Sequence, residues 1–219
     1  MNVCDESRPW IDISQPLNEK TAHWPGDTPF SYETALTKEE TGSVNIGRMT
    51  TSLHSGTHAD APFHVNDRGA GILDLDLHAF LGLARIVDVS NASVLDEKLF
   101  RTLDLDGTAR LLLKTSVPNR PERFPEAVPA LTEDGALFLA ELGLKLLGVD
   151  VPSIDPLDSR EVQAHHTLFE TGTAVLENLM LDDLPDGDYE LIALPLPLQG
   201  ADGSPVRAVV RPLPNEKGD

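Results

Sequence analysis

The segment 54–64, which reads HSGTHADAPFH, carries three of the chain's seven histidines together with one aspartate. These side chains, His54, His58, Asp60 and His64, all occupy even-numbered positions. Neutral imidazoles and a carboxylate, without a thiolate, suit Zn²⁺ or a neighbouring first-row ion such as Mn²⁺ or Fe²⁺. A single isolated histidine would more simply be a solvated loop residue, but this grouping predicts a metal site.

The geometry of the segment limits how these donors can meet. A helix would place His54 and His58 on one face but would rotate Asp60 away by about 240°. A straight strand, at ~3.3 Å per residue, would separate His54 from Asp60 by roughly 20 Å. The segment must therefore bend, and Gly56 and Pro62 are the residues that permit a bend. We expect a strand end that runs into a tight loop.

A complete site needs ligands from elsewhere in the chain. The best source is the pair His165 and His166, of which only one should reach the metal because adjacent side chains usually point apart. Glu177 interrupts an apolar run, and a buried carboxylate is costly unless it meets a cation; the alternative is a surface acid at a strand end. His78 is expected on a helix face or loop outside the site. His23 either lines a pocket or lies at an ordinary surface position.

The elements around these residues predict an α/β fold, a single domain with a mixed sheet flanked by helices. Thr132 is the expected N-cap of a helix that ends near Leu142, before Gly143, and residues 160–169 form a second, shorter helix. Residues 200–203 read as the turn of a hairpin that joins the last two strands. The proline-rich stretch 118–129 is expected to be a surface loop. Strands are expected at 10–14, 84–89, 109–115, 144–149, 173–176, 191–196 and 206–210.

Length and composition narrow the class of protein. The chain has 219 residues, 40% of them hydrophobic, which fits one domain spanning residues 1–219. A formal net charge of −19 disfavours nucleic acid and anionic membranes as partners. No apolar run is long enough to span a membrane and no signal peptide is evident, so we expect a cytoplasmic protein. Cys4 is the only cysteine, which excludes an intrachain disulfide.

The segment 54–64 resembles the H-x-G-T-H-x-D-x-P-x-H signature of the metal-dependent cyclase-like hydrolases, and in particular that of the bacterial arylformamidases among them. Three further stretches are similar to this family: WPGDTPF at 24–30, AHHTL at 164–168 with VLENL at 175–179, and LPLPLQG at 194–200 leading to GSPVR at 203–207. Together the resemblance covers residues 10–213.

The resemblance implies a fold of the swivelling β/β/α type and two zinc ions per subunit. One zinc would be held by His54, His58 and Asp60, and the second by Asp60, His165 and Glu177. His64 would transfer protons and Trp24 would contact an aromatic ring of the substrate, although simple packing would also account for a tryptophan before Pro-Gly. Manganese or iron remains compatible with these ligands.

The resemblance also implies a homodimer and an activity in tryptophan degradation through the kynurenine pathway. The expected reaction is the hydrolysis of the linear amide N-formyl-L-kynurenine to L-kynurenine and formate by metal-activated water. The alternative within the family is another small amide or a cyclic amide such as isatin. A structural metal in a binding domain is disfavoured, because structural zinc sites are closed and often contain cysteines.

Other hydrolase and cofactor classes lack their sequence signatures. A serine hydrolase would need a G-x-S-x-G elbow, which the chain does not contain. Neither a P-loop nor a Rossmann glycine pattern is present, so no nucleotide cofactor is expected.

Overall fold

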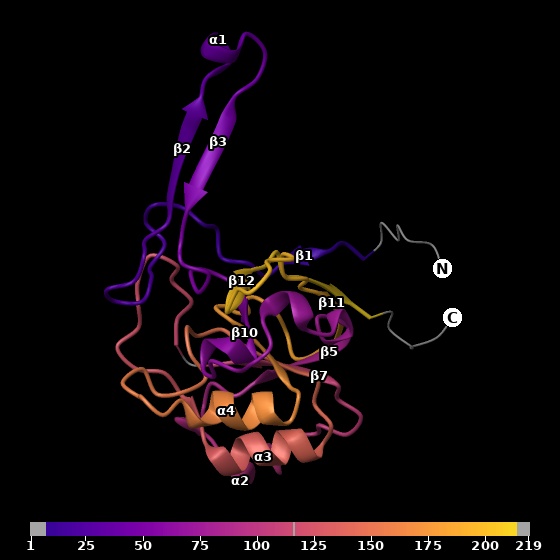
Figure 1. Cartoon of the computed structure of the whole chain (residues 1–219). Helices are drawn as coiled ribbons and strands as arrows, with labels where there is room; N and C mark the ends of the chain where they lie inside the picture. Colours follow the sequence, from indigo (N-terminus) through magenta and orange to yellow (C-terminus); the bar gives the residue numbers. More distant parts are fainter. Residues whose placement is uncertain (1–7, 116, 214–219) are drawn as a thin grey trace.

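The computed structural model describes residues 8–115 and 117–213. Its main feature is a nine-stranded mixed sheet in the order β1-β13-β11-β5-β7-β9-β10-β4-β12 (Figure 1). The expected mixed-sheet α/β class is confirmed. The middle of the sheet is parallel and is built from β5 (Leu81–Asp88), β7 (Arg110–Lys114), β9 (Leu146–Val149) and β10 (Ala174–Glu177).

Antiparallel strands extend the sheet on both sides. On the side of β5, β11 (Gly187–Ile192) is followed by β13 (Val209–Pro212) and β1 (Ile11–Asp12). On the side of β10, the short strands β4 (His58–Asp60) and β12 (Gly203–Pro205) complete the sheet. The carboxyl end of β10 therefore lies beside the histidine-rich segment, with Glu177 opposite His58.

Both faces of the parallel strands are buried. Along β7, Leu112 packs into one apolar cluster while Leu111 and Leu113 pack into the other, because successive side chains of a strand point to opposite faces. The cluster around Leu111 is covered by helices, and Figure 1 shows α3 and α4 side by side below the sheet. These helices are α2 (Glu97–Phe100), α3 (Glu133–Glu141) and α4 (Gln163–Glu170).

Helix α3 begins and ends where the sequence predicts. The Thr132 side chain accepts a hydrogen bond from the Gly135 amide, and Gly143 adopts a left-handed φ of 77° after the last turn. Shorter elements connect the rest of the chain. They are the 3-10 turns η1 (Pro62–His64), η2 (Ile72–Asp74) and η3 (Leu77–Ala79), and the two-residue strands β6 (Val94–Leu95) and β8 (Ala130–Leu131).

The predicted C-terminal hairpin is wrong in detail. The turn at 200–203 does not join two paired strands directly, because the residues after it form β12, which pairs with β4. Strand β11 also lies earlier than the expected 191–196, because its ladder with β13 ends at Ile192 and Pro195 joins Val206 only in an isolated antiparallel bridge. The two long strands still pair, with Ile192 opposite Val209.

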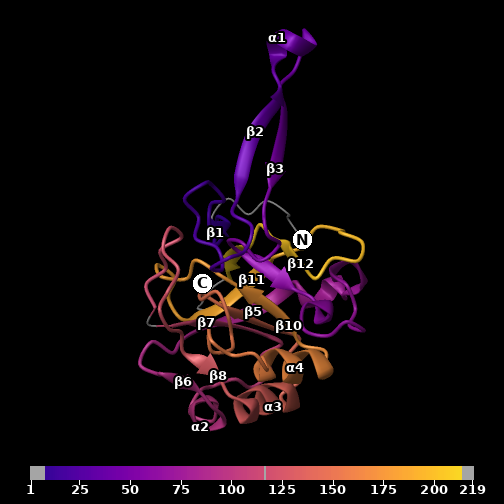
Figure 2. The same cartoon turned by 60° about the vertical axis from the view of Figure 1, so that its left-hand side comes forward.

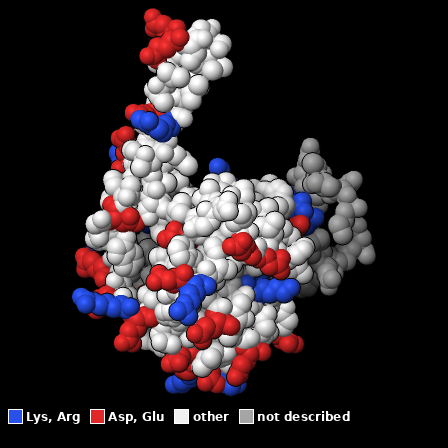
Figure 3. Space-filling view, viewed as in Figure 1, with Lys and Arg blue, Asp and Glu red and all other residues white. Residues whose placement is uncertain are grey.

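A hairpin that the sequence did not reveal projects from the body (Figure 2). It consists of β2 (Ser31–Leu36), the short helix α1 (Lys38–Thr41) and β3 (Ile46–Thr50), and every residue of its two strands is exposed. Glu33 and Arg48 form an ion pair across it. Acidic side chains are spread over the body and the tip of this arm on the face shown in Figure 3, in keeping with the net charge of −19. No helix among the described residues is long and apolar enough to cross a membrane.

Candidate metal centre

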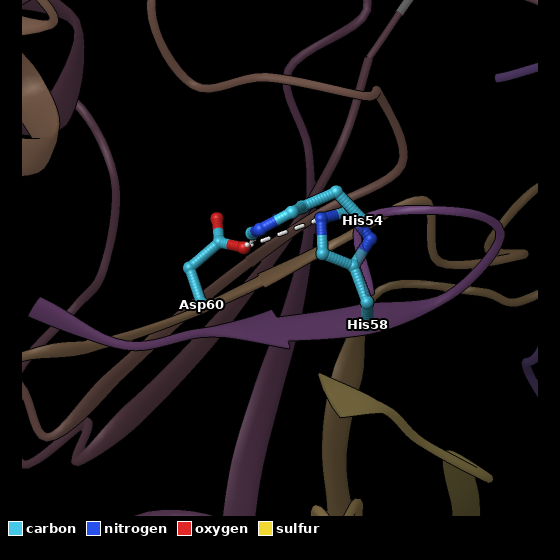
Figure 4. A group of neighbouring side chains, drawn as sticks. All are labelled: His54, His58 and Asp60. Atoms are coloured by element: carbon cyan, nitrogen blue, oxygen red, sulfur yellow. Dashed lines mark hydrogen bonds and ion pairs between the residues drawn. The ribbon is translucent and has the colours of Figure 1, made fainter. Parts of the chain in front are cut away.

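The segment 54–64 bends as the chemistry requires, but in a different order from the one predicted. It is a turn followed by a strand and a 3-10 turn, and not a strand that ends in a loop. Gly56 has a left-handed φ of 64°, which turns the chain before β4, and Pro62 opens η1 after it. His54 is thereby folded back over β4, and the side chains of His54, His58 and Asp60 converge (Figure 4).

The first donor group consists of His54, His58 and Asp60. The Nδ1 atom of His54 lies 2.8 Å from Oδ1 of Asp60, and the Nε2 atom of His58 lies 3.3 Å from the same oxygen. His58 and Asp60 are both only 1% exposed, whereas His54 lies closer to the surface.

The second donor group consists of Asp60, His165 and Glu177, and all three side chains are buried. The Nε2 atom of His165 is 3.3 Å from Oδ2 of Asp60 and 3.4 Å from Oε1 of Glu177. The structure places His165 at this point from α4, while its neighbour His166 is only partly buried and belongs to neither group. Asp60 offers one oxygen to each group, so its carboxylate lies between them.

The buried atoms of these groups fit a metal ion. His58 donates from Nδ1 to the carbonyl oxygen of Gly56 at 2.8 Å, which leaves the lone pair of Nε2 facing Asp60 and Glu177. This Nε2 atom is buried and has no hydrogen-bond partner among the described residues. Two buried carboxylates beside it are also costly without a cation. Imidazole and carboxylate donors in these positions fit a first-row divalent ion.

The charges of the centre depend strongly on one another. Burial raises the pKa of Glu177, and the neighbouring Asp60 raises it further. For Asp60 itself, burial opposes ionisation, but His58, His165 and His54 outweigh it and lower its pKa. Two carboxylates and their histidines therefore share charge at one buried point, which is typical of functional sites.

Two aspartates that sequence reasoning missed hold the histidines in place. Asp155 accepts hydrogen bonds from Nδ1 of His165 at 2.6 Å and from the backbone amides of Ala164 and His165, so it also caps α4. Asp202 accepts from Nε2 of His54 at 2.9 Å. Carboxylates that bind the second ring nitrogen of a metal-ligating histidine fix its tautomer and orientation. The signal available for Asp155 was an acid shortly after the parallel strand β9, and that for Asp202 was an acid two residues after the LPLPLQG motif at 194–200.

His64 stands at the mouth of the centre. Its ring lies 4.0 Å from that of His54, measured between centroids, and its Nδ1 atom is 3.6 Å from Asp202. Burial lowers the pKa of His64, and the nearby His54 lowers it further. A neutral imidazole that faces both the cavity and solvent can accept and return a proton.

A cavity of about 320 Å³ opens above the donors. His23 and Trp24 line one part of this cavity. The rings of Trp24 and Phe124 make an edge-to-face contact there, with a centroid distance of 5.2 Å. Phe124 belongs to the proline-rich stretch 118–129, so this stretch is a wall of the cavity as well as a surface loop. His78 lies on η3, exposed and outside the cavity.

Comparisons with known proteins agree with this geometry. Residues 11–156 match the sequence profile of the Cyclase family. The chain is 58% identical over 204 residues to a protein from Bacillus cereus named kynurenine formamidase, which covers 93% of this chain and 98% of that protein. The fold of the present chain matches that of a solved structure described as a potential metal-dependent hydrolase with cyclase activity. The TM-score is 0.83 at 25% identity, and the match covers 94% of this chain and 99% of that chain.

A more distant structure shares the fold alone. Isatin hydrolase A from Ralstonia solanacearum has a TM-score of 0.79 at 21% identity, with 95% of this chain and 93% of that chain covered. The resemblance found in the sequence is confirmed by these matches, and the chain belongs to the Cyclase family, whose fold it shares with metal-dependent hydrolases.

Proposed function

We propose that this protein is a metal-dependent amidohydrolase that cleaves N-formyl-L-kynurenine to L-kynurenine and formate. The observation that carries the proposal is the pair of donor groups joined at Asp60 on the floor of an aromatic-walled cavity. The kynurenine formamidase named among the relatives covers almost the whole chain at 58% identity, which supports this substrate. The likeness to isatin hydrolase rests on the fold only.

We infer that the centre holds two zinc ions. His54, His58 and Asp60 would hold one, and Asp60, His165 and Glu177 would hold the other, with Asp60 contributing to both. When bound, such ions lower the pKa of water and polarise the formyl oxygen. The same ligand types accept manganese or iron.

His64 is the residue that we assign to proton transfer. Cleavage of an aryl formamide releases an aniline nitrogen, which is a poor leaving group unless it receives a proton as the C–N bond breaks. His64 borders the cavity and belongs to neither donor group at Asp60; with His54 and Asp202 it forms a further, more exposed cluster of ligand-type atoms at the mouth. Its half-exposed imidazole can take a proton from water and deliver it to the departing nitrogen.

Trp24 and Phe124 are positioned to receive the aryl ring of the substrate. Their edge-to-face contact leaves apolar ring surface on the cavity wall, and Trp24 remains 39% exposed. Trp10 is similarly exposed but packs on Arg211 outside the cavity, whereas Trp24 lies in the cavity wall, and this position supports contact with an aromatic substrate.

We also propose that the chain forms one cytoplasmic hydrolase domain that assembles as a homodimer. The projecting hairpin supports the dimer, because its cross-strand pairs Tyr32–Met49 and Leu36–Ile46 are exposed apolar pairs. A two-stranded hairpin alone is marginally stable in water, and a second copy would cover it. Light scattering on the Tyr32→Ser, Met49→Ser double variant tests this, with a shift toward monomer expected and an unchanged mass contradicting it.

The substrate assignment is tested by comparing turnover of N-formyl-L-kynurenine with that of isatin. We expect kcat/KM for N-formyl-L-kynurenine to exceed that for isatin by at least about 10²-fold, because the two substrates place different groups in the cavity. A preference for isatin would replace the proposed reaction with cyclic-amide hydrolysis.

A further inference from the structure

A second cavity of about 420 Å³ adjoins the cavity above the metal centre. The two share part of their walls, including Gln15, Arg120, Pro152 and Asn178. Strand register explains their contact: Leu176 lies opposite Gly148, and the residues after Glu177 run beside Asp150, which directly follows β9, because the Asn178 amide donates to the carbonyl oxygen of Val151 at 3.0 Å. The second cavity therefore begins one strand away from the metal centre.

Arg120 is the available cation of the shared wall. It is exposed, lines both cavities and makes no ion pair with any residue in the described ranges 8–115 and 117–213. Its neighbour Arg123 instead lies 3.5 Å from Glu126. In a chain of net charge −19, an uncompensated guanidinium in a cavity wall is a specific attraction for an anion.

Asp150 is the counterpart of Arg120 in the second cavity. It follows β9, is only 4% exposed, and accepts a hydrogen bond from the Thr115 amide through Oδ2 at 2.9 Å. Its other oxygen, Oδ1, is buried and has no partner among the described residues. Burial raises the pKa of Asp150 to about 6, against the effect of the Thr115 amide. The metal centre makes no use of this carboxyl group.

We propose that the second cavity recognises the amino-acid end of the substrate, with Arg120 binding the α-carboxylate and Asp150 binding the α-ammonium group. The inference rests on the proposed function and deepens it, because only a zwitterionic aryl formamide needs both partners. The ring would lie against Trp24 and Phe124, so the formamide reaches the metal centre while the amino-acid side chain enters the second cavity. Isatin has no such side chain and would leave both charges unused.

The test compares three substrates: N-formyl-L-kynurenine, its deamino analogue with hydrogen in place of the α-amino group, and formanilide, which lacks the side chain. Arg120→Gln should lower kcat/KM at least about tenfold for the two carboxylate-bearing substrates, chiefly through KM, and by less than about twofold for formanilide. Asp150→Asn should lower kcat/KM by a similar factor for N-formyl-L-kynurenine only. Formanilide turnover reports in each case that the metal centre is intact.

Arg101→Gln is the matched control, because it also replaces an arginine by glutamine. Arg101 lies at the C-terminal end of α2, outside both cavities. It should leave all three substrates unaffected. An equal loss on all three substrates in the Arg120 and Asp150 variants, or no loss on any, would overturn the recognition of the amino-acid end. If the unmodified enzyme hydrolyses formanilide but not N-formyl-L-kynurenine, the proposed function itself fails, which is a separate result.

Discussion

The inner donor group, Asp60, His165 and Glu177, and the mouth of the cavity differ sharply in their surroundings. In the inner group, the side chains of Asp60, His165 and Glu177 are 1%, 4% and 4% exposed, and hydrogen bonds from several elements fix them. At the mouth, His64 and Asp202 are 36% and 39% exposed. A buried carboxylate cluster is suited to holding cations, whereas a half-exposed histidine can exchange protons with solvent. The inner group is therefore suited to holding metal, and the mouth is suited to the proton transfer proposed for His64.

The largest effect is expected at Asp60, which belongs to both groups. Asp60→Asn keeps the shape of the side chain but removes the charge shared by them, so most bound metal should be lost and turnover should fall about 10³-fold or more. Elemental analysis together with an activity assay measures both effects. Asp67→Asn, a nearby exposed change, is the control. Full metal occupancy in the Asp60 variant would refute the inner group as a metal site.

At the mouth, His64→Ala should lower kcat by about 10²- to 10⁴-fold while metal content stays at the level of the unmodified protein. The reason is that the proposed proton transfer by His64 needs no contribution from this residue to the inner group. His78→Ala, an exposed histidine on η3, provides the comparison. Loss of metal along with activity would show that His64 is a ligand, and the separation drawn between the two regions would disappear.

The aspartates that orient the histidines sharpen the comparison further. Asp155→Asn should weaken metal binding by about 10- to 100-fold, since Asp155 fixes His165 from a buried position. The corresponding Asp202→Asn change should cost less, because solvent can replace this exposed carboxylate beside His54. Competition with a chelator gives both affinities. Equal losses of metal affinity in the two variants would mean that the burial of the aspartate does not determine how much its hydrogen bond to the histidine contributes to metal binding.

The smallest effect is expected on the aromatic wall. Trp24→Ala should raise KM for the aryl substrate by roughly 2- to 10-fold with little change in kcat, because it removes a ring contact and no reacting group. Trp10→Ala is a control, as Trp10 packs on Arg211 outside the cavity. Steady-state kinetics decides the matter, and an unchanged KM would assign Trp24 to packing alone.

The sequence was informative where donors lie close together in the chain. The spacing of His54, His58 and Asp60 required a bend, and Gly56 was correctly identified as a residue that allows it. Thr132 likewise predicted the start of α3, because an N-cap is a local interaction. The same reasoning could not choose between His165 and His166, since the choice depends on how α4 is oriented against β4 and β10.

Long-range partners were beyond such reasoning. Asp155 and Asp202 reach their histidines only after folding, and their local patterns are those of ordinary turns. The projecting hairpin was missed because its strands, SYETAL and IGRMT, pack against no core and lack the regular alternation of polar and apolar residues that marks a strand. The expected strand 191–196 differs from β11 because the apolar pattern continues past Ile192, where the ladder with β13 ends, to Pro195, which joins Val206 in an isolated bridge.

The most direct test of the central claim is a metal titration of the purified protein. After chelation and dialysis, hydrolysis of N-formyl-L-kynurenine should be lost together with bound metal, and zinc should restore it in proportion until activity reaches a plateau at about two ions per chain. Turnover that persists undiminished at a metal content far below one ion per chain would contradict the account.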